Sequence, residues 1–111
     1  MTRIQQRRSL NRAWRRIAEV AQVPATATNS SQRQTVVSSL RCTHVQAMED
    51  QDKERARMGD VVRAYVVYTE PANGIATNMR FLLDGDYRIH AVTPHPAGRP
   101  IYLEIHLEEE A

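Results

Sequence analysis

MRFLLDGDYRIHAV, residues 79–92, is the stretch of this sequence that decides the fold. An apolar run at 79–83 and an alternating run at 86–92 flank Asp84-Gly85, a preferred residue pair for a tight hairpin turn. Successive side chains of a strand point to opposite faces, so the alternation sorts the second run into two sets. These are Tyr87, Ile89 and Ala91 on one face, and Arg88, His90 and Val92 on the other. The stretch therefore predicts a β-hairpin.

Strand-like segments continue on both sides of this hairpin. Residues 60–70 (DVVRAYVVYTE) are rich in valine and tyrosine, and a turn signal follows at 71–74. After a proline-containing turn at 93–98, residues 99–107 (RPIYLEIHL) alternate again. One face of this last run holds Ile101, Leu103, Ile105 and Leu107, and the other holds Tyr102, Glu104 and His106. The C-terminal half therefore predicts a four-stranded meander that contains the core.

The segments at 24–47 differ sharply from each other in composition. Residues 24–35 (PATATNSSQRQT) are small and polar, which predicts a loop or a long hairpin tip. Residues 36–47 (VVSSLRCTHVQA) predict a fifth strand, in which Leu40 and Cys42 share one face. Five or more strands suffice for a small barrel or sandwich.

Residues 8–22 (RSLNRAWRRIAEVAQ) carry two conflicting signals. Their apolar side chains recur at helical spacing, which predicts an N-terminal helix with Leu10, Trp14, Ile17 and Ala21 on one face. The β-branched Ile17, Val20 and Val23 instead favour a strand from Arg16 to Val23. We favour the helix and keep the strand as the competing interpretation.

Residues 48–59 (MEDQDKERARMG) interrupt the strand-like segments with a dense run of charged and amide side chains. They predict either a short exposed helix ended by Gly59 or a flexible charged insertion. Long connections in small domains are often binding elements. The expected architecture is thus an N-terminal arm or helix over 1–23, followed by one mainly-β domain over 24–111. We expect about five to six antiparallel strands in that domain, with an insertion at 48–59.

Length and composition exclude several classes of protein. A chain of 111 residues supports one domain and hardly two. The single cysteine, Cys42, excludes a disulfide framework or a multi-thiolate metal site within one chain. The longest apolar run, Ala64 to Tyr68, is far shorter than the ~20 residues of a membrane-spanning helix. No apolar stretch follows the basic N-terminus, so we expect no secretory signal.

The modest net charge of +2 hides an asymmetry between the two ends of the chain. Residues 1–18 contain six arginines and no acid, whereas residues 100–111 contain four glutamates and no lysine or arginine. Such a distribution favours head-to-tail association of copies, or a basic end that faces a polyanion. Two solvated termini would give the same pattern. An arginine-rich, acid-poor start also resembles an organelle transit peptide.

Motifs of known catalytic or cofactor chemistry are absent from the sequence, which has no GxSxG, P-loop, GxGxxG or HExxH. Cys42 with His44, and His90 with His106, are weak indications of a zinc site, and unrelated histidines explain them better. Turn chemistry explains the acidic residues beside Gly85. We therefore expect no enzyme activity, no metal and no cofactor.

The order of features over residues 60–108 resembles the phage head closure family, also called head–tail joining proteins, which includes head–tail adaptors and stoppers. In that family a hairpin block typically reads M-R-hydrophobic, then D-G, then Y-x-I and V. It matches Met79-Arg80-Phe81, Asp84-Gly85, Tyr87-Arg88-Ile89 and Val92 here. The charged run VQAMEDQDKERARMGD is similar to the family's connection before the preceding strand. Family members usually begin with a strand, from which the helix favoured at 8–22 departs.

The resemblance implies a virion structural protein of a tailed-phage neck. Such a protein is a small barrel that forms a ring below the portal, closes the filled head and docks the tail. The implied partners are other copies of the chain, a portal or adaptor protein on the head side, a tail protein on the other side, and packaged DNA in the channel. No membrane is implied. The implied location is the head–tail interface, with host cytoplasm during assembly.

Charged residues near the N-terminus, in the insertion and near the C-terminus are our candidates for inter-subunit or channel contacts. They are Arg7, Arg8, Arg12, Arg15, Asp50, Asp52, Lys53, Glu54, Arg55, Arg57, Glu108 and Glu109. The alternative function is a small nucleic-acid-binding barrel that uses the basic N-terminal arm. It predicts DNA binding that weakens steeply with salt.

Overall fold

The computed structural model describes residues 14–23, 33–49 and 63–109, and within these ranges it contains strands and no helix. The strands are β1 (Arg16–Gln22), β2 (Gln34–Cys42), β3 (Gln46–Ala47), β4 (Ala64–Thr69), β5 (Arg80–Leu82), β6 (Asp86–His95) and β7 (Tyr102–Glu109). All belong to one sheet in the order β2-β1-β5-β6-β7-β4-β3, and every pairing is antiparallel. The predicted mainly-β fold is confirmed, with seven strands in one sheet among the described residues where about five to six were expected.

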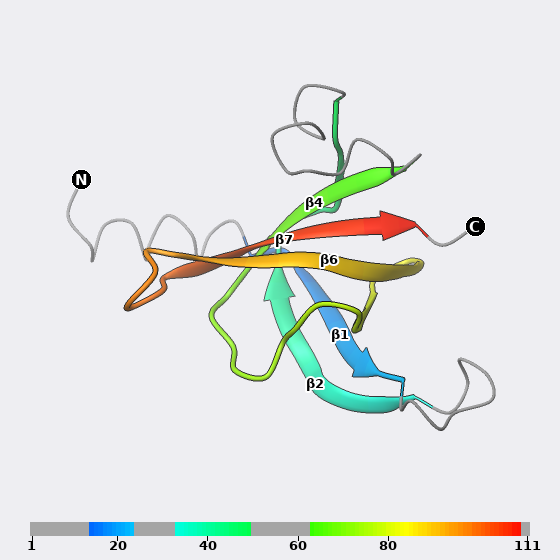
Figure 1. Cartoon of the computed structure of the whole chain (residues 1–111), viewed down its shortest axis with the longest axis horizontal. Helices are drawn as coiled ribbons and strands as arrows, with labels where there is room; N and C mark the ends of the chain where they lie inside the picture. The colour runs from blue at the N-terminus through cyan, green and yellow to red at the C-terminus, as the bar shows by residue number, and fades with distance from the viewer. Residues whose placement is uncertain (1–13, 24–32, 50–62, 110–111) are drawn as a thin grey trace.

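The predicted four-stranded meander is confirmed only for β5, β6 and β7, which are neighbours in that order in the middle of the sheet (Figure 1). The strand before them, β4, pairs with β7 instead of β5. The hairpin from 79–92 is confirmed, although its connection is one residue longer than expected. Leu82 pairs with Asp86, and the Leu83 N–H donates to the Gly85 carbonyl at 3.2 Å. Asp84 sits in the left-handed region at φ 54°, which aspartate tolerates better than most residues.

The core lies on the inner face of this sheet. Fully buried side chains come from all the longer strands and from the short β5, and the largest are Phe81, Leu40, Ile89, Ile105 and Leu107. The apolar face predicted for the last strand is confirmed, because Ile101, Leu103, Ile105 and Leu107 are all buried. The alternation of 99–107 therefore predicted the inward face of β7 correctly.

A β-bulge at His90 corrects the predicted faces of β6. Ile89 pairs with Leu107, but Ala91 pairs with His106, so one extra residue lies in β6 between these two pairs. The extra residue reverses the inward and outward positions that follow it. Val92, predicted to lie opposite Ile89, consequently packs against the core with it. The turn predicted at 93–98 also begins later, since β6 continues to His95.

The predicted N-terminal helix is wrong over residues 16–22, which form β1. This strand lies inside the sheet, paired with β2 on one side and β5 on the other. Ala18 and Val20 are buried, whereas Ile17 is 64% exposed. A backbone that has hydrogen-bonded neighbours on both sides outweighs a short helical pattern, and β-branched side chains suit such a position. The competing strand interpretation is the correct one here.

The strand predicted at 36–47 is divided into β2 and β3. Residues 43–45 interrupt it, although the Thr43 N–H still donates to the Tyr68 carbonyl at 2.9 Å. β2 pairs mainly with β1, and β3 pairs with β4. β2 also meets β4 at one residue pair, Cys42 and Thr69. The sheet therefore curls until its edge strand β2 meets β4. This single pair does not make the sheet a clearly closed barrel, so the predicted barrel or sandwich is confirmed only as a mainly-β sheet.

Several predicted segments fall largely or wholly outside the described residues. They are residues 8–13 of the expected helix, residues 24–32 of the loop at 24–35, and residues 50–59 of the charged insertion. Within the part of the chain that the structure covers, no helix is long and apolar enough to cross a membrane.

Candidate interaction surface

Most of the charged residues predicted as contacts lie outside the described ranges. These are Arg7, Arg8, Arg12, Asp50, Asp52, Lys53, Glu54, Arg55 and Arg57. Arg15, Glu108 and Glu109 are described. Arg15 is exposed just before β1, whereas the glutamates end β7.

The two glutamates at the end of β7 already have partners within the chain. Glu108 forms an ion pair with Arg88 on β6. Glu109 Oε2 lies 3.0 Å from Arg63 Nη1 and accepts a hydrogen bond from the Tyr65 hydroxyl at 3.3 Å. Burial first, and then the charge of Glu109, raise the pKa of Tyr65, while the hydrogen bond and charge of Glu109 raise the pKa of Arg63. These contacts link the end of β7 to β6 and to β4.

Cys42 and His44, which weakly indicated a zinc site, have different surroundings. Cys42 is fully buried at the end of β2, and desolvation by burial raises the pKa of its thiol to about 11. His44 follows the strand, is exposed, and places Nδ1 3.3 Å from Arg16 Nη1. A protonated, buried thiol is a poor nucleophile and a poor metal ligand.

The acidic residues of the hairpin turn bind arginines. Asp84 forms an ion pair with Arg16, which joins the β5–β6 turn to the start of β1. Asp86 accepts a hydrogen bond from Arg80 Nε at 2.7 Å and lies 3.6 Å from Arg33. Arg80 is only 6% exposed, so its charge needs such a partner. Turn chemistry and these pairs account for both carboxylates.

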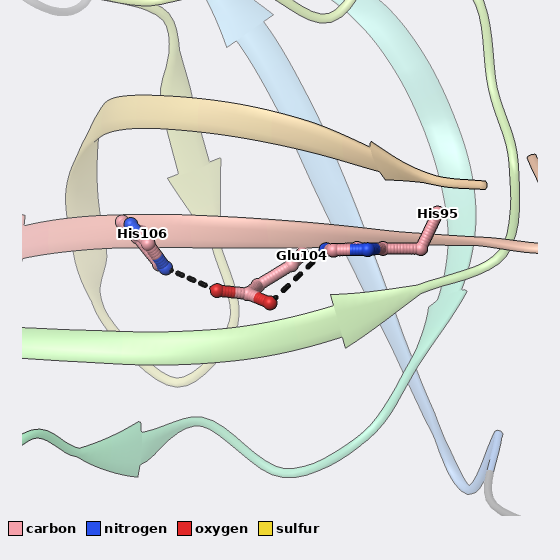
Figure 2. Close-up of polar contacts among 3 residues, drawn as sticks. All are labelled: His95, Glu104 and His106. Atoms are coloured by element: carbon pink, nitrogen blue, oxygen red, sulfur yellow. Dashed lines mark hydrogen bonds and ion pairs between the residues drawn. The ribbon is translucent and has the colours of Figure 1, made fainter. Parts of the chain in front are cut away.

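The most organised polar contacts outside these pairs lie on the outer face of β6 and β7. Glu104 sits between two histidines, with His106 Nε2 2.6 Å from Oε2 and His95 Nε2 3.2 Å from Oε1 (Figure 2). His106 is on the same strand as Glu104, whereas His95 ends the neighbouring strand. The two rings approach the carboxylate from opposite sides, so the three groups do not converge on one point (Figure 2).

Glu108 forms a second carboxylate centre farther along the same face. Besides its pair with Arg88, its Oε2 lies 4.0 Å from His90 Nδ1. Three of the four histidines in the sequence are therefore close to a glutamate of β7. We call this set of six side chains the β6–β7 strip: Arg88, His90, His95, Glu104, His106 and Glu108.

Aromatic rings continue the strip at its Glu104 end. The His95 ring stacks on Tyr102, with ring centroids 5.0 Å apart and planes inclined by 19°. Tyr102 in turn contacts the edge of Tyr68 on β4, with centroids 5.9 Å apart. These contacts fix the orientation of His95 and thus its approach to Glu104.

The sequence indicated only part of this strip. Alternation placed Tyr102, Glu104 and His106 on one face, and His90 and His106 were expected on neighbouring strands, as found. His95 was missed because Pro94 and Pro96 predicted a turn there. The bulge at His90 was also not foreseen, and it is the bulge that pairs His95 with Tyr102.

No group of three metal-ligand side chains capable of holding an ion occurs among residues 14–23, 33–49 and 63–109. The strip agrees with this result, because its histidines face separate sides of a carboxylate. Its chemistry is that of a surface with adjacent acids and imidazoles. Comparison of the chain with protein-family models, with curated proteins and with solved structures finds no match.

Proposed function

We propose that this protein is a structural component of a tailed-phage neck. In this proposal, copies of the chain form a ring below the portal, close the filled head and present a docking surface to the tail. Each copy contributes a small barrel, formed by the curled sheet in which the edge strand β2 meets β4 at Cys42 and Thr69. The chain acts by assembly and needs neither catalysis nor a cofactor.

The observation that carries the proposal is the fold of the residues that resemble the head closure family. Its hairpin block and final strand form β5, β6 and β7, and the valine-rich segment before them forms β4. β5, β6 and β7 are neighbours in that order in the sheet, and β4 lies on the other side of β7. Residues 16–22 form strand β1, so over these residues the chain does not differ from the family in the way that a helix would.

Ion pairs within the chain limit which charged side chains are available to contact other copies. Glu108 and Glu109 are held by Arg88 and Arg63, so they are weaker candidates for contacts with a second copy than their charge alone implied. The proposal therefore relies more on residues 1–13 and 50–59, which contain all the other predicted contact residues except Arg15.

The decisive test is a cryo-electron microscopy reconstruction of particles made in cells that express the surrounding structural genes. The protein carries a small C-terminal tag, and particles with the untagged protein serve as the control. The proposal requires tag density at one capsid vertex, between portal and tail. Particles without this density, with the protein free or on nucleic acid, would overturn it and support the nucleic-acid-binding alternative.

Deletion of residues 48–58 tests the assembly role of the insertion. We expect the deleted chain to keep the β-sheet circular dichroism of the parent and to be lost from purified particles, because the insertion contacts a neighbour. Gly98→Ala is the matched control, since a methyl group there meets open space. Normal, infectious particles from the deletion would contradict the role given to this segment.

A further inference from the structure

The β6–β7 strip holds most of the histidine in this protein on one surface. His95 and His106 contact Glu104, and His90 lies near Glu108. Imidazole is the side chain whose charge normally changes between about pH 5 and 8, whereas carboxylates and guanidinium groups keep theirs. The charge of this surface therefore depends on the protonation of three imidazoles.

The fixed charges of the strip are nearly balanced. Arg88 supplies one positive charge, and Glu104 and Glu108 supply two negative charges. With neutral imidazoles the strip is net negative by one, and with protonated imidazoles it is net positive by two. Protonation therefore reverses the sign of this surface.

The neighbours of the three imidazoles do not oppose this reversal. The titratable or charged groups that the structure places beside them are Tyr68 on β4, Arg88 on β6, and Tyr102, Glu104 and Glu108 on β7. Among the other positions that pair with the strip, Arg80 opposite Arg88 is charged, and Ala64, Val66, Ala91 and Thr93 are uncharged. Beyond Arg88, Asp86 lies between Arg80 and Arg33, which adds no net negative charge.

Protonation also adds donors that face away from the carboxylate. His95 and His106 both direct Nε2 at Glu104, so the proton added at acid pH is carried by Nδ1 on the other side of each ring (Figure 2). His95 is 38% exposed and His106 13%, so His95 is the more accessible donor. Charged N–H donors suit phosphate oxygens.

We propose that the β6–β7 strip is a proton-controlled binding surface for an extended polyanion with repeated phosphates. It binds when the imidazoles are protonated and releases when they are neutral, because protonation adds three positive charges to the strip. The strip runs along two strands, which suits an extended chain better than a single small anion. This inference stands apart from the proposed neck role, and either can fail without the other.

The test measures binding of a fluorescent DNA duplex of about 20 base pairs by anisotropy, near pH 5.5 and near pH 8, at several salt concentrations. Each new phosphate contact adds about 0.9 to the slope of log K against log salt. Three new contacts steepen the slope by up to about 2.7 at the lower pH. The N-terminal arginines keep their charge at both pH values, so their contribution cancels in the comparison.

Two variants locate the effect on the strip. In the double variant His95→Gln, His106→Gln one histidine of the strip remains, so the slope changes with pH by only about 0.9. His44→Gln is the matched control, because His44 is exposed and lies outside the strip beside Arg16. This control variant keeps the full change in slope between the two pH values that the parent protein shows. Circular dichroism at both pH values verifies that each variant is folded.

The proposal is overturned if the parent protein shows no steeper slope at the lower pH, or if the double variant retains the full change. It is also overturned if His44→Gln loses as much as the double variant. Should the double variant fail to fold, Glu104→Gln replaces it. Removing this carboxylate strengthens DNA binding near pH 8 if the strip is the binding surface, and unchanged or weaker binding refutes the proposal.

Discussion

Replacing Ile89 by alanine measures how strongly the meander core supports the fold. Ile89 is fully buried in the middle of β6, where it pairs with Leu107. The substitution removes three buried carbon groups, each of which contributes about 0.8 kcal/mol. The transfer term is thus about 2.4 kcal/mol, and the cavity left behind brings the expected loss of unfolding free energy to about 2–5 kcal/mol.

Ile17→Ala is the matched control, because it makes the same chemical change on a side chain that is 64% exposed. Only about a third of the transfer term applies there, so the expected loss is below about 1 kcal/mol. The assay is urea unfolding near pH 7, followed by circular dichroism and by Trp14 fluorescence. With a slope of about 1.5 kcal/mol per molar urea, a loss of 3 kcal/mol lowers the midpoint by about 2 M.

This pair of variants also decides between the two interpretations of residues 16–22. A helix with Leu10, Trp14, Ile17 and Ala21 on its apolar face buries Ile17, so its truncation would cost as much as that of Ile89. Strand β1 instead exposes Ile17 and buries Val20. Equal losses for the two isoleucine variants would refute the strand, and a negligible loss at Ile89 would refute the core.

Two further predictions concern the backbone and the thiol. Gly74→Ala should cost about 1–2 kcal/mol in urea unfolding, because Gly74 has φ 86° and a methyl group would lie 3.6 Å from Val36. Gly98→Ala, with open space and no such φ, should change stability by less than about 1 kcal/mol. Cys42 should react with a thiol reagent near pH 8 only after unfolding, because burial raises its pKa to about 11. Since the unfolded thiol ionises near 9, this group also makes stability fall as pH rises from 9 toward 11, and Cys42→Ala removes that contribution.

The parts of the fold that local patterns specify were predictable. Alternation in 99–107 fixes the inward face of β7, and Asp84-Gly85 fixes the position of the hairpin. At β1 the local patterns conflict, because one stretch carries both a helical spacing and β-branched residues. Its pairing with β2 and β5 decides the outcome, and these neighbours are distant in sequence. The sequence of residues 8–22 alone therefore cannot decide between a helix and a strand.

The candidate surface was harder to foresee, because pairs between strands create it. Glu104 and His106 lie two residues apart, so alternation alone places them on one face. His95 reaches Glu104 only through the register of β6 against β7, and Glu108 meets Arg88 through the same register. The histidine content of the chain indicated titratable groups, but gave no sign that three of them would share one surface.

One residue, His90, determines both the core and the outer face of β6. Before the bulge Ile89 pairs with Leu107, and an unbroken register would place His90 opposite His106 and Val92 opposite Glu104. Val92 would then face outward, and His95 would face the core. The extra residue reverses the alternation, so that Val92 packs inward and His95 turns outward beside Tyr102. Without the bulge, the sheet would bury an imidazole, and Glu104 would lose one of its two histidines. The apolar interior and the β6–β7 strip thus depend on the same local irregularity.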